Sequence, residues 1–341
     1  MFLQHLGATP VAVAQTRRVH FAKKLIDETE LPMTEVAMAS GFGSIRRFNA
    51  TFQKLYGRTP GELRRSTARE RSGNEAGVYS FRLGYRPPYN WASTIGFLAP
   101  RAIPGVEKIT LEEYRRTISL DGRAGFISVR PMFAKNYLEL RIEFPEPAAL
   151  FRIVERVRNI FDLRADPAEV DGHLRRDSRL KPLVRDHAGM RVPGCWDGFE
   201  IAVRAILGQQ VSVKGATTMA GRLVAEFGEA NIFPRAEALA EADLTRIGLT
   251  RQRAHSIREL ASAVARDEVS FDASLGLEAF EKAMTKLPGI GPWTAQYIAM
   301  RIGEPDAFPA GDLYLKSFAK ESEAWRPWRA YAALYIWSQP K

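Results

Sequence analysis

A glycine-rich string at residues 287–295 constrains the fold of this chain more than any other feature. It reads Leu-Pro-Gly-Ile-Gly-Pro-Trp-Thr-Ala and separates two helical patterns, 277–286 and 293–301. Two glycines around one apolar residue permit a hairpin whose backbone N–H groups face outward at the start of the second helix. Such a site binds a phosphate group without needing a cation. The alternative is a plain turn between two helices.

The periodicity changes along the 341 residues, and this change predicts several domains. Expected helices in residues 1–66 lie at 16–29, 33–39 and 44–56. Residues 67–78 are small, polar and aperiodic, which is typical of a linker. Near-alternating segments predict strands at 79–83, 109–120, 125–132 and 137–144, and the pattern is helical from Pro145 onward. We expect an α+β fold that is mostly α, with a small antiparallel sheet in a domain at 79–190 and a helical domain at 191–341.

The composition excludes several classes of protein. A hydrophobic share of 45% and a charged share of 26% fit a sizeable core and rule out a largely disordered chain. No stretch approaches the roughly 18 apolar residues of a membrane span, and the N-terminus has no basic-then-apolar leader. The lone Cys195 cannot form an intramolecular disulfide, a Cys-ligated zinc site or an iron–sulfur cluster. We therefore expect a cytoplasmic protein with no metal, no cofactor and no membrane partner.

The charge balance points to a polyanionic partner. Lys and Arg number 49 against 39 Asp and Glu, so the formal net charge is +10. Residues 1–70 hold 11 basic and 6 acidic side chains, and 11 − 6 = +5 is half of the total. A basic surface without a partner is the alternative.

Residues 33–60 have the pattern of two helices joined by a tight turn at Gly41. Ser44 is a candidate N-cap of the second helix. We expect the apolar side of that helix to consist of Phe48, Phe52 and Leu55, and its polar side of Arg46, Arg47, Asn49, Gln53 and Lys54. A recognition helix needs this division, since its apolar side anchors it while its polar side reaches bases and phosphates in the major groove. An ordinary surface helix with solvated arginines is the alternative.

This string resembles the second helix-turn-helix motif in the DNA-binding domain of the AraC family. That domain normally has two such motifs, and Phe2–Pro10 resembles only the end of the first. The resemblance implies DNA contacts through Ser44, Arg46, Arg47 and Asn49. It favours sequence-independent phosphate binding over recognition of an operator. It also makes RNA polymerase a candidate partner of this segment.

An aspartate, Asp312, lies 19 positions beyond Trp293, in the string Pro-Ala-Gly-Asp-Leu-Tyr-Leu-Lys-Ser-Phe. By itself Asp312 fits the start of a helix, as its N-cap. A Leu-Pro-Gly-Ile-Gly hairpin followed by an acid at this distance resembles the helix-hairpin-helix DNA glycosylase superfamily, in which that aspartate is essential. The resemblance implies a hairpin that holds the DNA backbone, formed by Leu287, Pro288, Gly289, Ile290, Gly291 and Thr294.

The residue that follows the hairpin bears on the type of reaction. Superfamily members that also cut the DNA strand carry a lysine there, because an amine is needed to form a Schiff base with the sugar. This sequence has Trp293 instead, and tryptophan cannot do that chemistry. Iron–sulfur members need four cysteines, whereas this chain has one. Both observations predict a monofunctional glycosylase that uses water as its nucleophile.

Further strings narrow the resemblance to the AlkA-type 3-methyladenine DNA glycosylase II branch, over about three quarters of the chain. They are Tyr85-Arg-Pro-Pro-Tyr-Asn-Trp91, Gly96-Phe-Leu98, Arg191-Val-Pro-Gly-Cys-Trp-Asp-Gly-Phe-Glu200, Ala205-Ile-Leu-Gly-Gln-Gln-Val-Ser-Val213, Trp325-Arg-Pro-Trp-Arg-Ala-Tyr-Ala332 and Ile336-Trp337. With the AraC-like segment in front, the chain resembles Ada-AlkA fusion proteins. It lacks their methyl-acceptor domain, so alkyl transfer to a protein thiol is not expected.

The resemblance implies an aromatic base pocket. A base alkylated at a ring nitrogen is cationic, and an aromatic face attracts it by about 0.5–2 kcal/mol. The matching positions are Trp293, Tyr297 and Trp337, with Phe97 from the sheet-containing domain. Core packing is the alternative for each of them.

The resemblance also implies how the base is reached and released. Gln210, in the Leu-Gly-Gln turn and with Gln209 beside it, fills the gap that an extruded nucleotide leaves in the duplex. The alternative for Gln210 is a helix-start amide that binds the backbone. Asp312 lies close to C1′ and stabilises the positive charge that develops on the sugar. Whether it acts as a stabiliser or as a general base stays open.

Three functions remain candidates at this point. The first is excision of alkylated bases, of the 3-methyladenine and 7-methylguanine type, from double-stranded DNA by a monomeric enzyme. The second is a DNA-binding transcriptional regulator of the alkylation response, with little or no glycosylase activity. The third is a non-catalytic helix-hairpin-helix scaffold, against which the position of Asp312 and the aromatic set argue.

Overall fold

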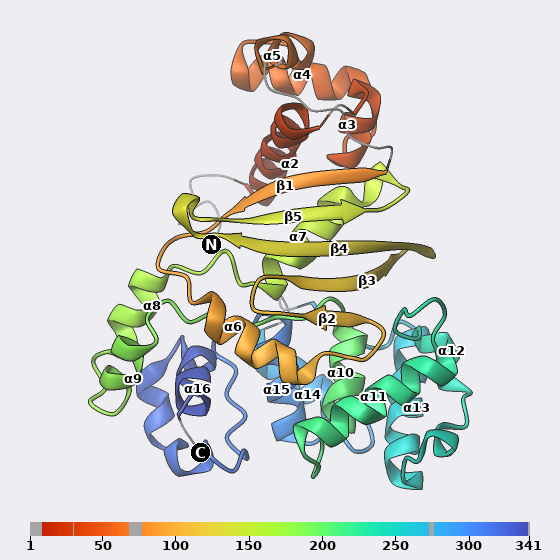
Figure 1. The fold of residues 1–341 in the computed structure, drawn as a ribbon, viewed down its shortest axis with the longest axis vertical. Helices are drawn as coiled ribbons and strands as arrows, with labels where there is room; N and C mark the ends of the chain where they lie inside the picture. Colours follow the sequence, from red (N-terminus) through yellow and green to blue (C-terminus); the bar gives the residue numbers. More distant parts are fainter. Residues whose placement is uncertain (1–8, 30, 68–76, 273–275, 340–341) are drawn as a thin grey trace. The chain divides into compact units, whose positions relative to one another are not determined.

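The computed structural model describes residues 9–29, 31–67, 77–272 and 276–339. The chain divides into two compact units, one made of Met1–Arg82, Ile118–Ser128 and Glu139–Glu155, the other of Leu83–Thr117, Val129–Leu138 and Arg156–Lys341. The expected fold class is confirmed, since the described residues are mostly helical and contain one small antiparallel sheet (Figure 1). Residues 2–8 of the expected partial motif, and 68–76 of the expected linker, lie outside the described residues.

The helix-turn-helix segment belongs to the first unit. It comprises α2 (Pro10–Glu28), α3 (Met33–Ala39), α4 (Ile45–Tyr56) and α5 (Pro60–Thr67). The prediction of α3 is confirmed at both ends. Helix α2 starts at Pro10 rather than at residue 16, because the Thr9 side chain accepts a hydrogen bond from the N–H of Ala12 and proline suits the first helical position.

Helix α4 has the cap and the turn that the sequence predicts. The Ser44 hydroxyl accepts a hydrogen bond from the N–H of Arg47 at 3.3 Å, and Gly41 makes the preceding turn with a φ of +76°. Phe48 and Phe52 are fully buried. Leu55 follows on the same side of α4, but its side chain is 51% exposed, because the buried stripe of α4 ends one turn before the helix does.

Aromatic packing joins α2 to the rest of the first unit. The ring of Phe21 lies 6.2 Å from that of Phe81 in β1 (Val78–Gly84) and 5.0 Å from that of Phe151 in α7 (Leu150–Ile160). The Nζ of Lys24 also donates a hydrogen bond to the carbonyl oxygen of Arg82. The helix-turn-helix segment therefore shares a core with the sheet residues of its unit.

The sheet has five strands in the order β1-β5-β4-β3-β2 (Figure 1). The others are β2 (Glu107–Ile109), β3 (Tyr114–Leu120), β4 (Arg123–Met132) and β5 (Tyr137–Glu143). Along β3 every second residue is buried, as the alternation predicts. Asp121 and Gly122 form the expected turn between β3 and β4, with φ values of +50° and +73°.

The expected strand at 109–120 is in fact two strands, β2 and β3. The hydroxyl oxygen of Thr110 accepts hydrogen bonds from the N–H groups of Glu112 and Glu113, at 3.3 and 3.1 Å, and so closes a turn. The two strands then pair antiparallel, with Ile109 opposite Tyr114. Alternation misses this turn, because threonine is common in strands and in turns alike.

The second unit consists mainly of helices, as expected from the pattern after the sheet. Its α-helices are α6 (Trp91–Leu98), α8 (Pro167–Leu174), α9 (Leu180–Asp186), α10 (Gly198–Leu207), α11 (Val213–Phe227), α12 (Ala236–Ala240), α13 (Arg251–Ala265), α14 (Leu277–Met284), α15 (Pro292–Ile302) and α16 (Arg329–Trp337). Short 3-10 turns include η2 (Ala99–Arg101), η5 (Leu244–Ile247), η7 (Lys316–Phe318) and η8 (Glu321–Trp325). Among the described residues no helix has both the length and the hydropathy that crossing a bilayer requires.

Helix α10 lies in the core of this unit and packs against α13 and α15. Its Glu200 is buried and accepts a hydrogen bond from Arg116 of β3 at 2.7 Å. Arg204, one turn later, donates to Glu200 at 3.0 Å and to Glu107 of β2 at 3.2 Å. These buried charges are paired, so they fix α10 against the edge of the sheet and hold Arg204 in place.

Candidate active site

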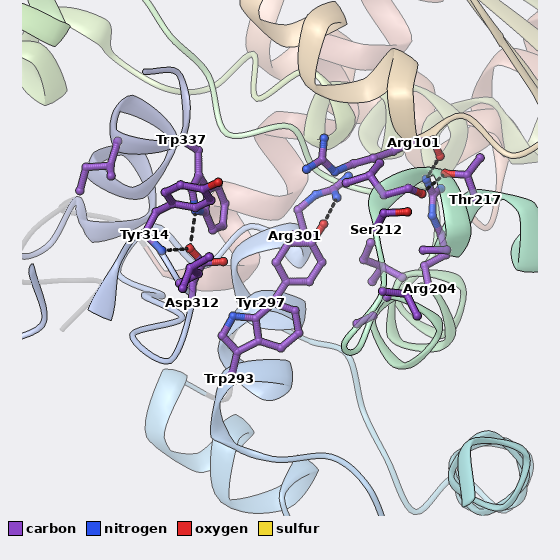
Figure 2. A pocket seen from close by; sticks show the side chains of 18 of the residues that line it. Arg101, Arg204, Ser212, Thr217, Trp293, Tyr297, Arg301, Asp312, Tyr314 and Trp337 are labelled. Atoms are coloured by element: carbon purple, nitrogen blue, oxygen red, sulfur yellow. Dashed lines mark hydrogen bonds between the residues drawn. The ribbon is translucent and has the colours of Figure 1, made fainter. Parts of the chain in front are cut away.

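A pocket of about 750 Å³ lies within the second unit (Figure 2). Its walls come from η2, α10, α11, α15, α16 and the segment around residues 312–318. Four of the predicted residues line it: Trp293, Tyr297, Asp312 and Trp337. The polar remainder of the lining comprises Arg101, Arg204, Ser212, Thr217, Arg301, Tyr314 and Gln339.

Helix α15 carries two aromatic rings into the pocket. It begins after Gly291, with Pro292 in its first turn. Trp293 and Tyr297 are four residues apart and so share a face of the helix, where their rings stack at 5.6 Å with an interplanar angle of 8°. Ala295 and Ala299 are buried in the core, which turns the aromatic face towards the pocket.

Asp312 is held by two hydrogen bonds to the same oxygen (Figure 2). The Nε1 of Trp337 donates to Oδ1 at 3.0 Å, and the N–H of Tyr314 donates to Oδ1 at 2.9 Å. For Oδ2 the described residues provide no hydrogen-bond partner. Two donors on one oxygen fix the orientation of the carboxylate and leave the other oxygen for a ligand.

The helix expected after Asp312 is no more than a single turn. Oδ1 of Asp312 accepts from the N–H of Tyr314, and its carbonyl oxygen accepts from the N–H of Lys316 at 2.9 Å, as at a helix start. The next regular element is the short η7 (Lys316–Phe318). The turn places the carboxylate beside Trp337.

Phe97 does not line the pocket. The guanidinium carbon of Arg101 lies 3.9 Å from the centre of its ring, and that of Arg301 lies 5.0 Å away. Arg101 also donates a hydrogen bond to the carbonyl oxygen of Phe97 at 2.8 Å. In this structure Phe97 supports two arginines, and Arg101 reaches the pocket in its place.

Three arginines surround the phenol of Tyr297. Arg301 donates from Nη1 to the Tyr297 hydroxyl at 2.9 Å and from Nη2 to the carbonyl oxygen of Gly194 at 2.8 Å. Burial by itself raises the pKa of Tyr297, but the charges of Arg301, Arg101 and Arg204 outweigh it. The pKa of Tyr297 therefore lies below its ordinary value.

These arginines are the site residues that sequence reasoning missed. In a basic chain their charges do not stand out from those of surface arginines. The signal available is spacing, since Arg101 follows Phe97 by four residues and Arg301 follows Tyr297 by four. Arg204 likewise follows Glu200 by four residues, but its second carboxylate partner, Glu107, lies 97 positions away in the sequence.

The predicted hairpin joins α14 to α15 (Figure 1). Gly289 has a φ of +77°, and a Cβ at this position would lie 2.0 Å from the hydroxyl oxygen of Ser256, so the site requires glycine. Ile290 is buried and anchors the hairpin, whereas Pro288, Gly289 and Gly291 are exposed. Leu287 is partly buried against the core, and Thr294 is buried in the first turn of α15.

The two predicted gap-filling residues differ in their surroundings. Gln210 is exposed in the turn between α10 and α11 and has a left-handed backbone, with a φ of +55°. The Gln209 side chain instead donates from Nε2 to the carbonyl oxygen of Gly289 at 2.8 Å and to the hydroxyl oxygen of Thr294 at 3.0 Å.

The predicted contacts of the helix-turn-helix segment form a separate candidate surface in the first unit. Arg46, Arg47 and Asn49 are exposed on α4, and Ser44 is exposed at its start. No metal-binding group of three or more His, Cys, Asp or Glu side chains exists in the described parts of the chain. Burial raises the pKa of the Cys195 thiol to about 12, so this cysteine is unreactive at neutral pH.

Family models match three stretches of the chain. They are a helix-turn-helix domain at residues 1–66, the AlkA N-terminal domain at 80–197, and the HhH-GPD superfamily of base excision DNA repair proteins at 203–335. The last range holds the hairpin, Asp312 and the stacked rings. Fold and site together thus define a helix-hairpin-helix protein of the base excision repair class.

Individual proteins narrow this class. The probable bifunctional transcriptional activator/DNA repair enzyme AlkA of Mycobacterium tuberculosis is 38% identical over 98% of this chain and 72% of its own length. DNA-3-methyladenine glycosylase 2 of Escherichia coli is 32% identical over 75% of this chain and 96% of its own length. The chain belongs to the AlkA family of DNA-3-methyladenine glycosylases. A solved structure, the 3-methyladenine DNA-glycosylase of Archaeoglobus fulgidus, has the same fold, with a TM-score of 0.65 and 24% identity over 75% of this chain and 96% of that one.

Proposed function

We propose that this chain hydrolyses the N-glycosidic bond of alkylated bases, of the 3-methyladenine and 7-methylguanine type, in double-stranded DNA. The observation that carries the proposal is an oriented carboxylate, Asp312, in one pocket with the stacked rings of Trp293 and Tyr297. The Escherichia coli relative, a DNA-3-methyladenine glycosylase, and the Mycobacterium tuberculosis relative, a probable DNA repair enzyme, support the same reaction class.

The aromatic pair is suited to an electron-poor base. Stacking and cation–π attraction stabilise a cationic purine by about 0.5–2 kcal/mol for each ring. The charges of Arg101 and Arg301 oppose such a base, and the same charges lower the pKa of the Tyr297 phenol. The charge of Arg204 is neutralised by Glu107 and Glu200.

Access to the glycosidic bond requires that the nucleotide leave the duplex, at a cost of a few kcal/mol. In this proposal the exposed Gln210 fills the gap, and the hairpin at 287–291 holds a neighbouring phosphate at the N-terminus of α15. Base flipping places C1′ near Asp312.

The reaction then breaks the bond between C1′ and the base nitrogen, and the base leaves with the electron pair. Positive charge develops on the sugar, and Oδ2 of Asp312 stabilises it, since Oδ1 is occupied by Trp337 and Tyr314. A water molecule adds to C1′ and loses a proton, which leaves an abasic sugar and a free base.

We further propose that the enzyme is monofunctional and does not cut the DNA strand. A Schiff base with the sugar needs an amine, and none of the described residues that line the pocket is a lysine. The position after the hairpin is occupied by Trp293, whose ring is stacked on Tyr297.

Incubation of the protein with methylated duplex DNA tests this function. We expect free 3-methyladenine or 7-methylguanine in the supernatant, an alkali-sensitive but uncut strand, and no covalent adduct after borohydride reduction. Absence of released base contradicts the glycosylase proposal. A borohydride-trapped adduct contradicts the monofunctional part.

The exposed side of α4 supports a second function, binding of duplex DNA by the helix-turn-helix segment. Arg46, Arg47 and Asn49 are exposed there, while Phe48 and Phe52 anchor the helix inside. Each phosphate contact that is lost reduces the salt slope of binding by about 1.

We therefore expect Arg46→Ala/Arg47→Ala to lower the slope of log K against log salt by about 2 for an undamaged duplex. Arg185→Ala is the matched control, because Arg185 is exposed on α9 and pairs with Asp186. An unchanged slope in the double variant removes α4 from DNA binding.

A further inference from the structure

The turn between α10 and α11 is tied to the hairpin by the side chain of Gln209. Its amide nitrogen donates to the carbonyl oxygen of Gly289 at 2.8 Å and to the hydroxyl oxygen of Thr294 at 3.0 Å. Gly289 belongs to the hairpin, and Thr294 to the first turn of α15, which also carries Trp293. One amide group therefore joins the turn, the hairpin and the helix of the base pocket.

Helix α13 holds the same turn from another side. Arg253 donates from Nη2 to the backbone carbonyl oxygen of Gln209 at 2.7 Å. Ser256, three residues further along α13, lies so close to Gly289 that a Cβ there would be 2.0 Å from its hydroxyl oxygen. The α10–α11 turn contacts the hairpin, the hairpin contacts α13, and α13 contacts the α10–α11 turn. A shift of this turn therefore breaks at least one of these contacts.

The residue that these contacts constrain is Gln210. It is exposed, and its left-handed backbone, with a φ of +55°, is uncommon for a residue other than glycine. Such a conformation persists where the surrounding structure holds the backbone. Gln209, the residue before Gln210, is held in place by hydrogen bonds of its side-chain amide and of its carbonyl group, and it thereby constrains the backbone of Gln210.

We propose that Gln209 is a positioning residue that fixes the distance between the phosphate-binding hairpin and Gln210, the residue that fills the gap of the extruded nucleotide. This inference rests on the proposed function. It gives Gln209 a role different from that of Gln210. In the proposed function the hairpin and Gln210 both contact DNA. The distance between them therefore has to match the distance between a phosphate group and the gap that the extruded base leaves.

Two substitutions test the amide directly. Gln209→Ala removes the side chain, whereas Gln209→Glu keeps its size but replaces the donating amide with a carboxylate that faces the carbonyl oxygen of Gly289. We expect both variants to lower the single-turnover rate of base release from a 7-methylguanine duplex about tenfold. Gln252→Glu is the matched control for the added charge, because the Gln252 side chain is exposed on α13 and only its backbone carbonyl, which the substitution keeps, accepts a hydrogen bond from Ser256; we expect its rate to equal that of the wild type.

A double-mutant cycle distinguishes positioning from a separate structural effect. If Gln209 acts through Gln210, Gln209→Ala changes the rate less than twofold once Gln210→Ala is present. The same tenfold loss in both backgrounds overturns the proposal. A wild-type rate for Gln209→Glu also overturns it, and this isosteric variant serves as the test if Gln209→Ala does not fold.

A readout that needs no catalysis separates this inference from the proposed function. The wild-type protein is added to a duplex that carries 2-aminopurine beside the lesion, and fluorescence reports the loss of stacking. We expect a several-fold rise with the wild type and Gln252→Glu, and a much smaller rise with Gln209→Glu at saturating protein. Equal rises for all three overturn the positioning role. Absence of base release by the wild type, with the fluorescence differences intact, counts against the proposed function alone.

Discussion

Trp337 contributes an N–H group to the site as well as an aromatic ring. Its Nε1 is one of two donors that fix Oδ1 of Asp312, and a hydrogen bond to a charged group contributes about 1.5–3 kcal/mol. Trp337→Phe keeps an aromatic ring but loses the donor. We expect it to lower the single-turnover rate of base release at least tenfold with little change in DNA affinity.

The matched control for this prediction is Trp328→Phe, since Trp328 packs against Tyr331 outside the residues that line the pocket. Rates are measured with enzyme in excess over a defined alkylated duplex, so that product release does not mask the chemical step. Equal rates for Trp337→Phe and the wild type mean that the orientation of Asp312 does not depend on this hydrogen bond.

Asp162 makes stability depend on pH. Burial raises the pKa of Asp162 to about 6, against the opposing effects of the Tyr331 hydroxyl, the Arg191 charge and the N–H of Val192. The folded state therefore holds this proton more tightly than the unfolded state. The resulting stabilisation is complete below the unfolded pKa near 4 and disappears as pH rises through about 6.

We expect the free energy of unfolding of the wild type to fall by about 1 kcal/mol between pH 5 and pH 7, relative to that of Asp162→Asn. Asparagine has nearly the same shape and tolerates the φ of +47° at this position. Urea unfolding at the two pH values measures the difference. Parallel pH dependences for the two proteins contradict a raised pKa at Asp162.

At the scale of residues, the sequence predicts the residues that carry the chemistry of the site, but it predicts less well which residues surround them. Trp293, Tyr297, Asp312 and Trp337 come together in the pocket as expected from motifs. The sequence does not predict that Arg101, and not Phe97, lines the pocket. This outcome depends on how the guanidinium groups of Arg101 and Arg301 pack against the ring of Phe97. Arg204 pairs with Glu200 one turn earlier in α10 and with Glu107 of β2, and local patterns carry a trace of the first pair only.

The hairpin depends on one glycine much more than on the other. Gly289 has a φ of +77° and contacts Ser256, whereas Gly291 has a φ of −88° and open space where a Cβ would be. Gly289→Ala therefore forces strain and a steric clash, which together cost on the order of 1–3 kcal/mol. Gly291→Ala is the matched control, and we expect it to alter stability by less than about 0.5 kcal/mol.

Both variants are compared by urea unfolding and by binding to an undamaged duplex. We expect Gly289→Ala to lose stability and about tenfold in DNA affinity, since the hairpin changes shape. The account of the hairpin is wrong if the two alanine variants unfold at the same urea concentration.

At the scale of elements, helices with clear caps are predicted well, and elements that end in a side-chain turn are not. Ser44 marks the start of α4 correctly. Thr110 divides a predicted strand, and the helix expected after Asp312 is only a single turn that the Asp312 side chain caps. In both failures a short polar side chain binds backbone N–H groups nearby, an option that hydrophobic periodicity does not register.

At the scale of the molecule, the helix-turn-helix segment is built into its unit rather than only tethered to it. Phe21 packs against Phe81 and Phe151, from residues that belong to the AlkA-type part of the chain. The sequence predicts the helix-turn-helix segment and the AlkA-type part separately. It contains no pattern that indicates packing between them, because aromatic residues on α2 would equally fit a core within the helix-turn-helix segment alone. Contacts between distant segments have to be seen in three dimensions.

We expect Phe21→Ala to destabilise the first unit by about 3 kcal/mol, the usual cost of removing a buried phenylalanine ring. Leu55→Ala is the control in the same unit, because Leu55 is 51% exposed and its loss removes little buried surface. Thermal unfolding followed by circular dichroism measures both. Equal melting curves for the two variants contradict a shared core between α2 and the sheet residues of this unit.

The central claim is that the Asp312 carboxylate drives release of an alkylated base held against stacked aromatic rings. Asp312→Asn changes one oxygen to an amide and leaves the shape of the side chain intact. The most direct measurement is single-turnover release of 7-methylguanine from a defined duplex, with DNA affinity measured in parallel. The account predicts a loss of at least a thousandfold in rate with affinity within about threefold of the wild type, as an electrostatic stabiliser of the transition state requires. Release at the wild-type rate by Asp312→Asn contradicts it.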